Sequence, residues 1–320
     1  MTPTATAVYT HPACLQHDPG PQHPESPDRL HAVLQALKAP GFEALQWHEA
    51  PAGTVAQVLL VHTPDYVEEV QAASPRQGYR ALDGGDTIMS PGTYEAVLRC
   101  VGAACASVDD VVAGKARNTF CATRPCGHHA EADRAMGFCV FNQAAIAALH
   151  ARQAHGLQRV AVMDFDVHHG NGTQHTFYND ANLFYGSSHQ APFYPGTGAQ
   201  QEAGVAGNIV NIPLARGCNS ATFRSRMTEQ MLPALRRFAP ELLIISAGFD
   251  AHHLDPLGGL GFTDDDFHWI TRELMAIADV SARGRVVSIL EGGYSLQGLA
   301  SGTQAHVLAL MGRPQGNAAS

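Results

Sequence analysis

Apolar runs recur along the chain with the length and spacing of buried strands. Six of them are rich in β-branched and aromatic residues, and helix-like segments separate most of them. The six runs cover residues 118–123, 160–164, 182–187, 208–213, 241–247 and 285–290. Strands that alternate with helices usually form a parallel sheet with helices on both faces. The pattern therefore predicts an α/β fold.

Two helices are indicated between these strands. The clearer one begins after Thr263, with Asp266 three residues on as the partner of a capping box. The apolar residues of 267–277 then recur on one helical face, which we assign to the core. The other helix follows Ser220, and Pro233 should kink or end it.

The polar end of one apolar run suggests a metal site. The run MDFDVHHGNGT places Asp164, Asp166 and His168 at two-residue steps. Alternate residues of an extended segment face the same way, so these side chains should point into one cavity. Gly170 and Gly172 are then expected to turn the chain. Such a cluster of uncompensated carboxylates usually needs a cation.

Two further strands end in residues that bind metals. Asp250 follows the run 241–247, and His128 and His129 follow the run 118–123. One Asp-x-His pair with a distant Asp supplies two oxygens and one nitrogen, which leaves a position open for water as in catalytic zinc sites. Each residue alone could equally be an ordinary loop or core residue. Three clusters at strand ends together favour a catalytic site.

Composition limits the classes of partner. With 320 residues and 45% apolar content, the chain can bury a large core. No linker, charge block or repeat divides it, so we expect a single domain over residues 1–320. The net charge is −9 and there is no Lys/Arg-rich stripe, so direct nucleic-acid binding is not expected. The acidic balance favours cationic substrates such as lysine-bearing peptides or polyamines.

Targeting signals and cysteines indicate the compartment. The chain shows no signal-peptide pattern and no apolar run that could span a bilayer, so we expect a cytoplasmic protein without a membrane partner. Its seven cysteines lack CxxC spacing, which indicates reduced thiols. Cys126, two residues before His128, is interpreted as an inert small residue, because thiol reactivity needs an activating setting.

Several longer motifs carry a family resemblance. They include HPESPDRL, RPCGHHAE, DFDVHHGNGTQ, SAGFDAHHLDPLGG and LEGGYSL, in this order over residues 23–296. With these motifs the chain resembles the histone deacetylase superfamily, which includes bacterial deacetylase-like amidohydrolases and acetylpolyamine amidohydrolases. The resemblance implies a three-layer arginase/deacetylase-type α/β fold around an eight-stranded parallel sheet.

The resemblance also implies two cations. Asp166, His168 and Asp250 match the family's metal ligands, for which zinc is the natural occupant, although ferrous iron suits the same atoms. The family also carries potassium beside the zinc. Its ligands would be side chains or backbone carbonyls at or near Asp164, Asp166, His168, Ser187 and Ser188.

The catalytic groups follow from the same resemblance. His128 and His129 match the tandem histidines, of which one acts as general base on water and the other protonates the leaving amine. Asp164 would orient His128, and Asn171 would orient His129. An Asn, where some relatives have Asp, leaves its histidine less basic. Tyr294 matches the tyrosine that donates a hydrogen bond to the oxyanion.

The substrate path is expected from the resemblance alone. Gly137, Phe138 and Tyr194 match the residues that line the tunnel for an acyl-lysine stem. Arg29 matches an arginine of the product channel, although a charge on a surface helix is almost as good an interpretation. The chain departs from many relatives at two further places. Cys126 replaces a Pro and Gln143 replaces an Asn.

The predicted function is a zinc-dependent amidohydrolase that removes acyl groups from amines, with acyl-lysine as the favoured substrate. Leu257 stands where a polyamine-selective relative carries a cation-recognising Glu, which favours lysine over polyamine substrates. The alternatives are an acetylpolyamine deacetylase, a non-catalytic protein that binds a metal or an acyl ligand, and an arginase-type hydrolase. A homo-oligomer is compatible with the sequence.

Overall fold

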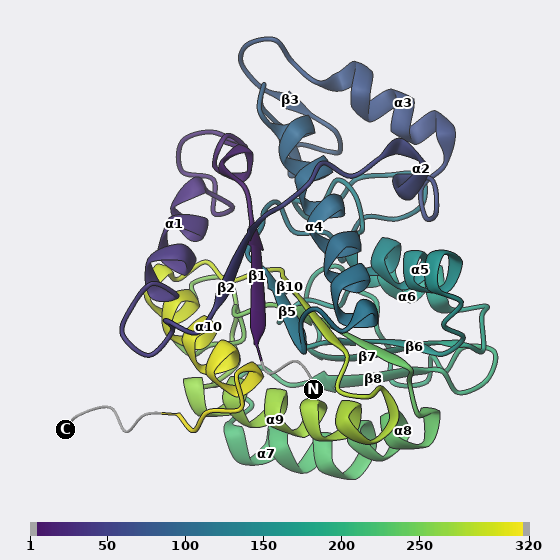
Figure 1. Ribbon diagram of the computed structural model, residues 1–320. Coiled ribbons are helices and arrows are strands. Elements are labelled where there is room, and N and C mark those ends of the chain that lie inside the picture. Colours follow the sequence, from purple (N-terminus) through teal and green to yellow (C-terminus); the bar gives the residue numbers. More distant parts are fainter. Residues whose placement is uncertain (1–4, 316–320) are drawn as a thin grey trace.

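A parallel sheet of eight strands forms the centre of the computed structural model, which describes residues 5–315 (Figure 1). The strand order is β2-β1-β5-β10-β9-β6-β7-β8, and each neighbouring pair is parallel. The predicted α/β class and the eight-stranded parallel sheet are confirmed. The strands are β1 (Thr6–Thr10), β2 (Gln46–Glu49), β5 (Asn118–Cys121), β6 (Val160–Asp164), β7 (Leu183–Gln190), β8 (Ile209–Leu214), β9 (Leu242–Ala247) and β10 (Val286–Leu290).

Helices cover both faces of the sheet, so the fold has three layers (Figure 1). One layer contains α4 (Thr93–Ala113), α5 (Gln143–His155) and α6 (Asn171–Phe177). The opposite layer contains α1 (Pro27–Ala36), α7 (Ser220–Arg226), α8 (Leu232–Phe238), α9 (Asp264–Ser281) and α10 (Leu296–Leu310). Shorter elements lie outside these layers: a 3₁₀ turn (Pro12–Leu15), α2 (Val55–Val58), α3 (Pro64–Ala73) and the hairpin of β3 (Arg80–Ala81) and β4 (Ile88–Met89).

The strands are apolar on both sides because both faces of the sheet are buried. In β6, Val160 and Val162 pack in the core beneath α4 and α5. Ala161 and Met163 point the other way, into the core beneath α1 and α7–α10. All four side chains are fully buried. A continuous apolar run, rather than an alternating one, is therefore the expected signal of these strands.

Two strands, β2 and β1, are not among the six runs that the sequence pattern predicted. β2 lies at the edge of the sheet and its four residues, Gln46–Glu49, are all exposed. Because residues on both of its faces are exposed, this strand carries no apolar run. β1 is short and apolar, but it lies close to the N-terminus, before any recognisable helix. The alternation of strands and helices therefore does not mark it.

Both predicted helices are present, but the second differs from the prediction at Pro233. α9 begins at the capping box of Thr263 and Asp266, as predicted. Pro233 was expected to kink or end the helix after Ser220; the helical segment continues past it to Phe238, so Pro233 does not end it. A π-helical turn over Met227–Met231 instead lies between α7 and α8 and places Pro233 in the first turn of α8, where its missing N–H costs no hydrogen bond.

Gly172 does not turn the chain as expected. Gly170 caps α6, and Gly172 lies inside the first turn of that helix. A Cβ on Gly172 would come within 2.1 Å of the Ala130 carbonyl oxygen. The glycine is needed because the helix passes close to the loop that carries His128 and His129.

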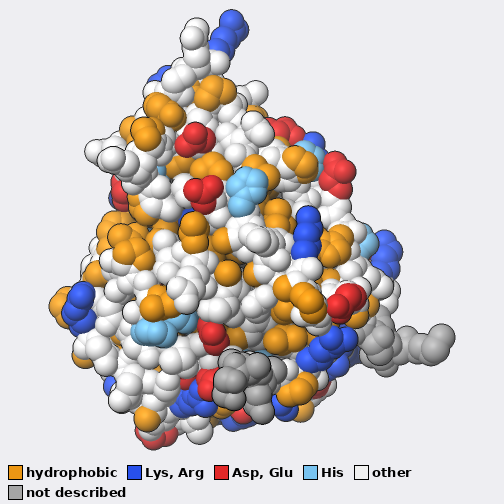
Figure 2. All heavy atoms as spheres, turned by 90° about the vertical axis from the view of Figure 1, so that its left-hand side faces the viewer, with side chains coloured by type: hydrophobic (Ala, Val, Ile, Leu, Met, Phe, Trp, Pro, Cys, Tyr) orange, Lys and Arg blue, Asp and Glu red, His pale blue; other side chains and the backbone are white. Residues whose placement is uncertain are grey.

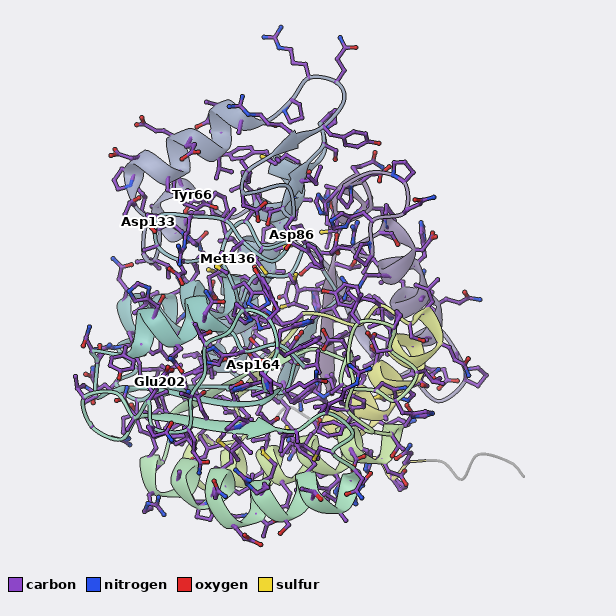
Figure 3. All side chains as sticks on the ribbon, turned by 180° about the vertical axis from the view of Figure 1, so that it is seen from behind. Tyr66, Asp86, Asp133, Met136, Asp164 and Glu202 are labelled. Atoms are coloured by element: carbon purple, nitrogen blue, oxygen red, sulfur yellow. The ribbon has the colours of Figure 1, made fainter. Side chains whose placement is uncertain are left out.

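The topology brings four loops together. The strands β5, β10, β9 and β6 are neighbours in the sheet, and parallel strands end at the same edge. The loops after these strands carry the His pair, Tyr294, Asp250 and the Asp166–His168 pair. Figure 3 labels Asp164 within the sheet region and Asp86 and Met136 in the loops above it. This is the edge at which open α/β sheets bind ligands.

On the face in Figure 2, Lys and Arg side chains are scattered among acidic and apolar ones. Within residues 5–315, each helix is too short or too polar to cross a bilayer.

Candidate active site

Asp166, His168 and Asp250 meet at the carboxyl ends of β6 and β9. The Nδ1 atom of His168 lies 3.1 Å from Asp166 Oδ1 and 3.1 Å from Asp250 Oδ2. One ligand atom from each residue lies within 4.8 Å of the other two. The two carboxylates are fully buried and the imidazole is mostly buried. The three predicted metal ligands are therefore brought together.

Backbone amides hold the second oxygen of each carboxylate. The N–H of Val167 donates to Asp250 Oδ1 at 2.8 Å, and the N–H of Gly292 donates to Asp166 Oδ2 at 2.8 Å. A Cβ on Gly292 would lie 2.2 Å from Asp250 Oδ2, so only glycine fits beside the two carboxylates. These bonds fix the direction of the remaining lone pairs.

The charges in this cluster are strongly coupled. Burial and the neighbouring charge of Asp166 raise the pKa of Asp250 to about 7. Burial lowers the pKa of His168, but its hydrogen bonds to the two carboxylates outweigh burial and raise that pKa to about 10. Two buried carboxylates thus demand a positive charge at the point where they face each other. The donor set of two oxygens and one imidazole nitrogen suits zinc or ferrous iron.

His128 and His129 lie next to this cluster with their ring centroids 4.0 Å apart. Nδ1 of His128 lies 2.9 Å from Asp164 Oδ2, and Nδ1 of His129 lies 2.9 Å from Asn171 Oδ1. His128 Nε2 is 3.9 Å from Asp166 Oδ2. Both pairings that the sequence predicted are present, and each leaves the Nε2 side of its ring available for chemistry.

The two histidines differ in charge. Burial alone would lower the pKa of His128, but the carboxylates of Asp164, Asp166 and Glu291 raise it well above its ordinary value. Burial, followed by the nearby His128 and His168, holds the pKa of His129 well below its ordinary value. A neutral amide partner, Asn171, cannot reverse this effect.

Tyr294 faces the same space from the loop after β10. Its ring lies 5.9 Å from that of Phe138, and the Arg29 guanidinium carbon lies 4.9 Å from its centroid. Its backbone N–H donates to Asp255 Oδ2 at 2.6 Å. Burial raises the pKa of Tyr294 well above its ordinary value, so the phenol keeps its proton.

A narrow cavity of about 90 Å³ connects these groups with the surface. A Cβ on Gly137 would lie 2.5 Å from His129 Cδ2, so a glycine is required where the wall meets that histidine. Tyr194 and Leu257 are 39% and 37% exposed, as expected at a mouth. The lining residues are Asp86, His129, Gly137, Phe138, His168, Tyr194, Leu257 and Tyr294.

Arg29 is not a surface charge, so that alternative is wrong. The side chain is buried, and Nη1 donates to Glu25 Oε1 at 2.8 Å. Nε and Nη2 donate to the carbonyls of Gly293 and Glu291, both at 2.6 Å. Arg29 therefore supports the loop that carries Tyr294 from behind.

The expected potassium ligands are also close together. Asp164 and Ser187 are register partners on β6 and β7, and both are fully buried. The Ser187 hydroxyl pairs with His189 Nδ1 at 2.9 Å. Among the described residues, the buried Ser188 hydroxyl has no hydrogen-bond partner.

Sequence reasoning missed Glu291, Asp255 and Asp86, although the first two lie inside quoted motifs. Glu291 Oε2 accepts the Gly127 N–H at 2.8 Å, and Oε1 accepts the Ser246 hydroxyl at 3.0 Å. Asp255 joins the Tyr294 loop to Leu257, whose N–H donates to Oδ1 at 2.9 Å. The signal was an acidic residue beside glycines in LEGGY and DPLGG.

The sequence also gave no sign of a buried ion-pair network that lies behind the site. Arg124 binds both carboxylate oxygens of Glu25, which also binds Arg29 and His17. Nothing in the spacing of these residues indicated that they meet, because 99 positions separate Glu25 from Arg124.

The two departures from the family pattern have a structural setting. Cys126 is buried with its Sγ 3.4 Å from that of Cys139, and all seven cysteines are buried and unbridged. Gln143 Nε2 donates to the Pro125 carbonyl at 3.2 Å, which braces the turn before His128. Neither residue displaces a group of the candidate site.

Carboxylates, an imidazole and a histidine pair thus meet at the ends of neighbouring parallel strands, and this arrangement could hold a metal ion beside two groups that transfer protons, as in hydrolases. The family model "Histone deacetylase domain" matches residues 23–310. The chain belongs to the histone deacetylase family, a family of hydrolases.

Three known proteins illustrate the relationship. The histone deacetylase-like amidohydrolase of Pseudomonas aeruginosa is 36% identical over 312 residues, which cover 91% of this chain and 82% of that protein. The polyamine deacetylase HDAC10 of Homo sapiens is 36% identical over 304 residues, which cover 91% of this chain and 45% of that protein. The crystal structure of the HDA15 HD domain matches with a TM-score of 0.92 at 34% identity, covering 100% of this chain and 91% of that chain.

Removing Asp250 should abolish metal retention at this site. In Asp250→Ala only one carboxylate and one imidazole remain, and two ligands do not hold a divalent ion firmly in an open site. We expect the variant to hold one equivalent of metal fewer than the wild type after dialysis, measured by elemental analysis, and to lose its activity. Asp86→Asn is the matched control, because Asp86 lies in the same cavity but outside the ligand set, and it should keep the metal. A metal content in Asp250→Ala equal to that of the wild type would show that the ligand set is wrong.

Proposed function

We propose that this protein is a zinc-dependent deacetylase that hydrolyses acyl groups from amines, with acyl-lysine as the substrate. One observation carries the proposal. His129, His168 and Tyr294 line one narrow cavity. His168 contacts the carboxylates of Asp166 and Asp250, and the ring of His129 lies beside that of His128, so the ligand cluster and the histidine pair adjoin this cavity. A protein that only bound an acyl ligand would need neither a proton shuttle nor an oxyanion donor.

Asp166, His168 and Asp250 would hold the zinc ion, and the demand of two buried carboxylates for positive charge supports this. When bound, zinc polarises an amide carbonyl and lowers the pKa of water towards ~7. Ferrous iron suits the same atoms.

The histidine pair would divide the proton transfers. His129 is held neutral by burial and by its neighbours, so its Nε2 can accept a proton from the attacking water. His128 is held in its charged form by Asp164, so it can protonate the leaving amine. The two partners, one ionic and one neutral, set the roles apart.

Tyr294 would donate a hydrogen bond to the oxyanion of the tetrahedral intermediate. Its hydroxyl keeps its proton at neutral pH, and Asp255 and Arg29 fix the backbone and the ring. A preorganised donor of this kind acts on charge that appears only in the transition state.

The cavity would accept the aliphatic stem of an acyl-lysine. Phe138 and Tyr194 supply aromatic walls, and Gly137 keeps the passage open beside His129. A stem of methylene groups gains by burial in such a slot, whereas a bulky side chain does not fit in about 90 Å³.

We also propose that potassium binds beside the zinc site. Asp164 and Ser187 are register partners on neighbouring parallel strands, so their buried side chains lie side by side on one face of the sheet. A monovalent cation there would keep Asp164 ionised, and Asp164 would in turn hold the charge on His128.

An acetylated polyamine is the second candidate substrate. The human relative at 36% identity is named a polyamine deacetylase. Asp86 at the cavity would attract a distal ammonium, but Leu257 at the mouth cannot pair with one. The apolar Leu257 favours acyl-lysine.

Tyr294→Phe should lower the turnover number by roughly 10²–10³ because one transition-state hydrogen bond is lost. Metal content and substrate affinity should stay unchanged, since the hydroxyl is outside the ligand set. Steady-state kinetics on an acetyl-lysine peptide and metal analysis measure both. Tyr94→Phe removes a hydroxyl from α4, away from the cavity, and should be inert. Nearly unchanged turnover in Tyr294→Phe would remove Tyr294 from the mechanism.

Leu257→Glu should raise the preference for acetylated polyamines over acetyl-lysine peptide by a few-fold. The new carboxylate can pair with the distal ammonium, but a partly exposed ion pair contributes only ~1 kcal/mol or less. The ratio of kcat/KM values for the two substrates is the measurement. Leu254→Glu is the matched control, because Leu254 is equally exposed but does not line the cavity. A wild type that already prefers polyamines, or an unmoved ratio, contradicts the assignment.

A further inference from the structure

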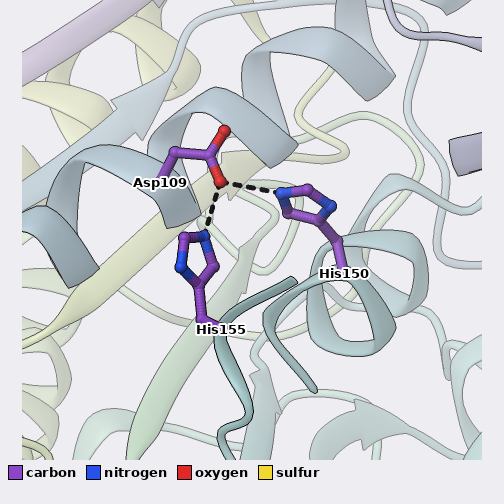
Figure 4. Close-up of side chains that lie close together, drawn as sticks. All are labelled: Asp109, His150 and His155. Carbon is purple, nitrogen blue, oxygen red and sulfur yellow. Dashed lines mark hydrogen bonds and ion pairs between the residues drawn. The ribbon is translucent and has the colours of Figure 1, made fainter. Parts of the chain in front are cut away.

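A second cluster of ligand atoms lies between α4 and α5, outside the candidate active site. It consists of Asp109 on α4 and His150 and His155 on α5 (Figure 4). Nε2 of His150 lies 2.8 Å and Nε2 of His155 lies 2.7 Å from the same oxygen, Asp109 Oδ1. Two imidazoles from one helix therefore converge on one carboxylate oxygen of the next.

The side chains are arranged as ligands around a common point. The two imidazole rings are nearly perpendicular, at 86°, with centroids 5.8 Å apart, so they approach from different directions (Figure 4). The side chains of His150 and His155 are 13% and 23% exposed, whereas that of Asp109 is 49% exposed. The protein thus supplies three ligand atoms and leaves the solvent side open to water.

We propose that Asp109, His150 and His155 form a second metal site, which binds a divalent transition ion of the zinc class. A donor set of imidazole nitrogen and carboxylate oxygen favours such ions over Mg²⁺ or Ca²⁺, which prefer sites made of oxygen atoms. A water molecule completes the tetrahedron. Bond lengths of about 2.0–2.2 Å in a tetrahedral site place ligand atoms ~3.3 Å apart, so the present contacts need to open by only roughly 0.5 Å.

Binding requires no net loss of protons from the neutral rings. In the hydrogen-bonded state each ring donates through Nε2–H to Asp109. A neutral imidazole can carry its proton on Nδ1 instead, which frees the Nε2 lone pair for the ion. The ion then replaces two hydrogen bonds to one oxygen with three coordinate bonds.

The location indicates a structural role. Asp109 lies near the C-terminal end of α4, and His155 is the last residue of α5 before Gly156 turns the chain towards β6. The catalytic loops follow the opposite ends of the strands. An ion here would cross-link the ends of two neighbouring helices without touching the candidate active site, and the inference does not depend on the proposed reaction.

The test is to count zinc ions in the holoenzyme. Wild type and a His150→Gln, His155→Gln double variant would be equilibrated with buffered free Zn²⁺ and analysed for bound metal. We expect wild type to hold one more equivalent than the double variant, with unchanged activity in both. Once the candidate active site is filled, further Zn²⁺ should raise the melting temperature of wild type but not that of the double variant, because a ligand that binds only the folded state stabilises it.

Two further variants keep the test decisive. Asp109→Asn preserves the shape and the hydrogen-bond acceptor but removes the charge, so it should fold and bind the second zinc at least ~10-fold more weakly. His31→Gln, an exposed histidine on α1, is the matched control and should keep the second equivalent. Equal metal content in wild type and double variant, or full second-site affinity in Asp109→Asn, would overturn the proposal and leave the cluster as hydrogen bonds alone.

Discussion

The candidate active site depends on the confinement of two buried carboxylates, Asp166 and Asp250, at the ends of neighbouring strands. Each would repel the other in a medium of low dielectric constant, and desolvation alone disfavours both charges. Val167 N–H, Gly292 N–H and the ring of His168 offset part of this cost. The raised pKa of His168 reflects how strongly these carboxylates favour a positive charge between them. A metal ion bound there, as we propose, would supply that charge in place of the proton on the imidazole.

The surrounding structure holds these groups in register. Glu25 lies between Arg29 and Arg124 in a buried ion-pair network. Arg29 donates hydrogen bonds to the carbonyls on either side of Gly292, and Arg124 lies just before the loop of His128. The network therefore joins two of the four site loops to the N-terminal segment. Removing one member would leave a buried charge unpaired, which is far more costly than losing a surface ion pair.

Most of the sheet, and the site residues that directly follow its strands, could be predicted because short sequence patterns determine them. Central strands such as β6 and β9 are apolar on both faces, and ligands at two-residue steps, such as Asp164 and Asp166, share one direction. The edge strand β2 was missed because it is exposed. That the helix continues past Pro233 could not be predicted, because it depends on a π-helical turn that has no simple sequence signature. The Glu25–Arg124 pair could not be found, because contacts over long sequence separations depend on the tertiary fold. The pairing of Asp109 with His150 and His155 was missed for the same reason.

We propose that one cation, bound by Asp166, His168 and Asp250, drives amide hydrolysis. The most direct test is to titrate metal-free protein with Zn²⁺ while following the hydrolysis of an acetyl-lysine peptide. The His150→Gln, His155→Gln double variant is the protein to use, because it removes the second cluster as a competitor for zinc. Activity should be absent without metal, rise linearly and reach its plateau at one equivalent per chain. Full turnover by the metal-free protein, or a plateau that requires further equivalents, would contradict the account.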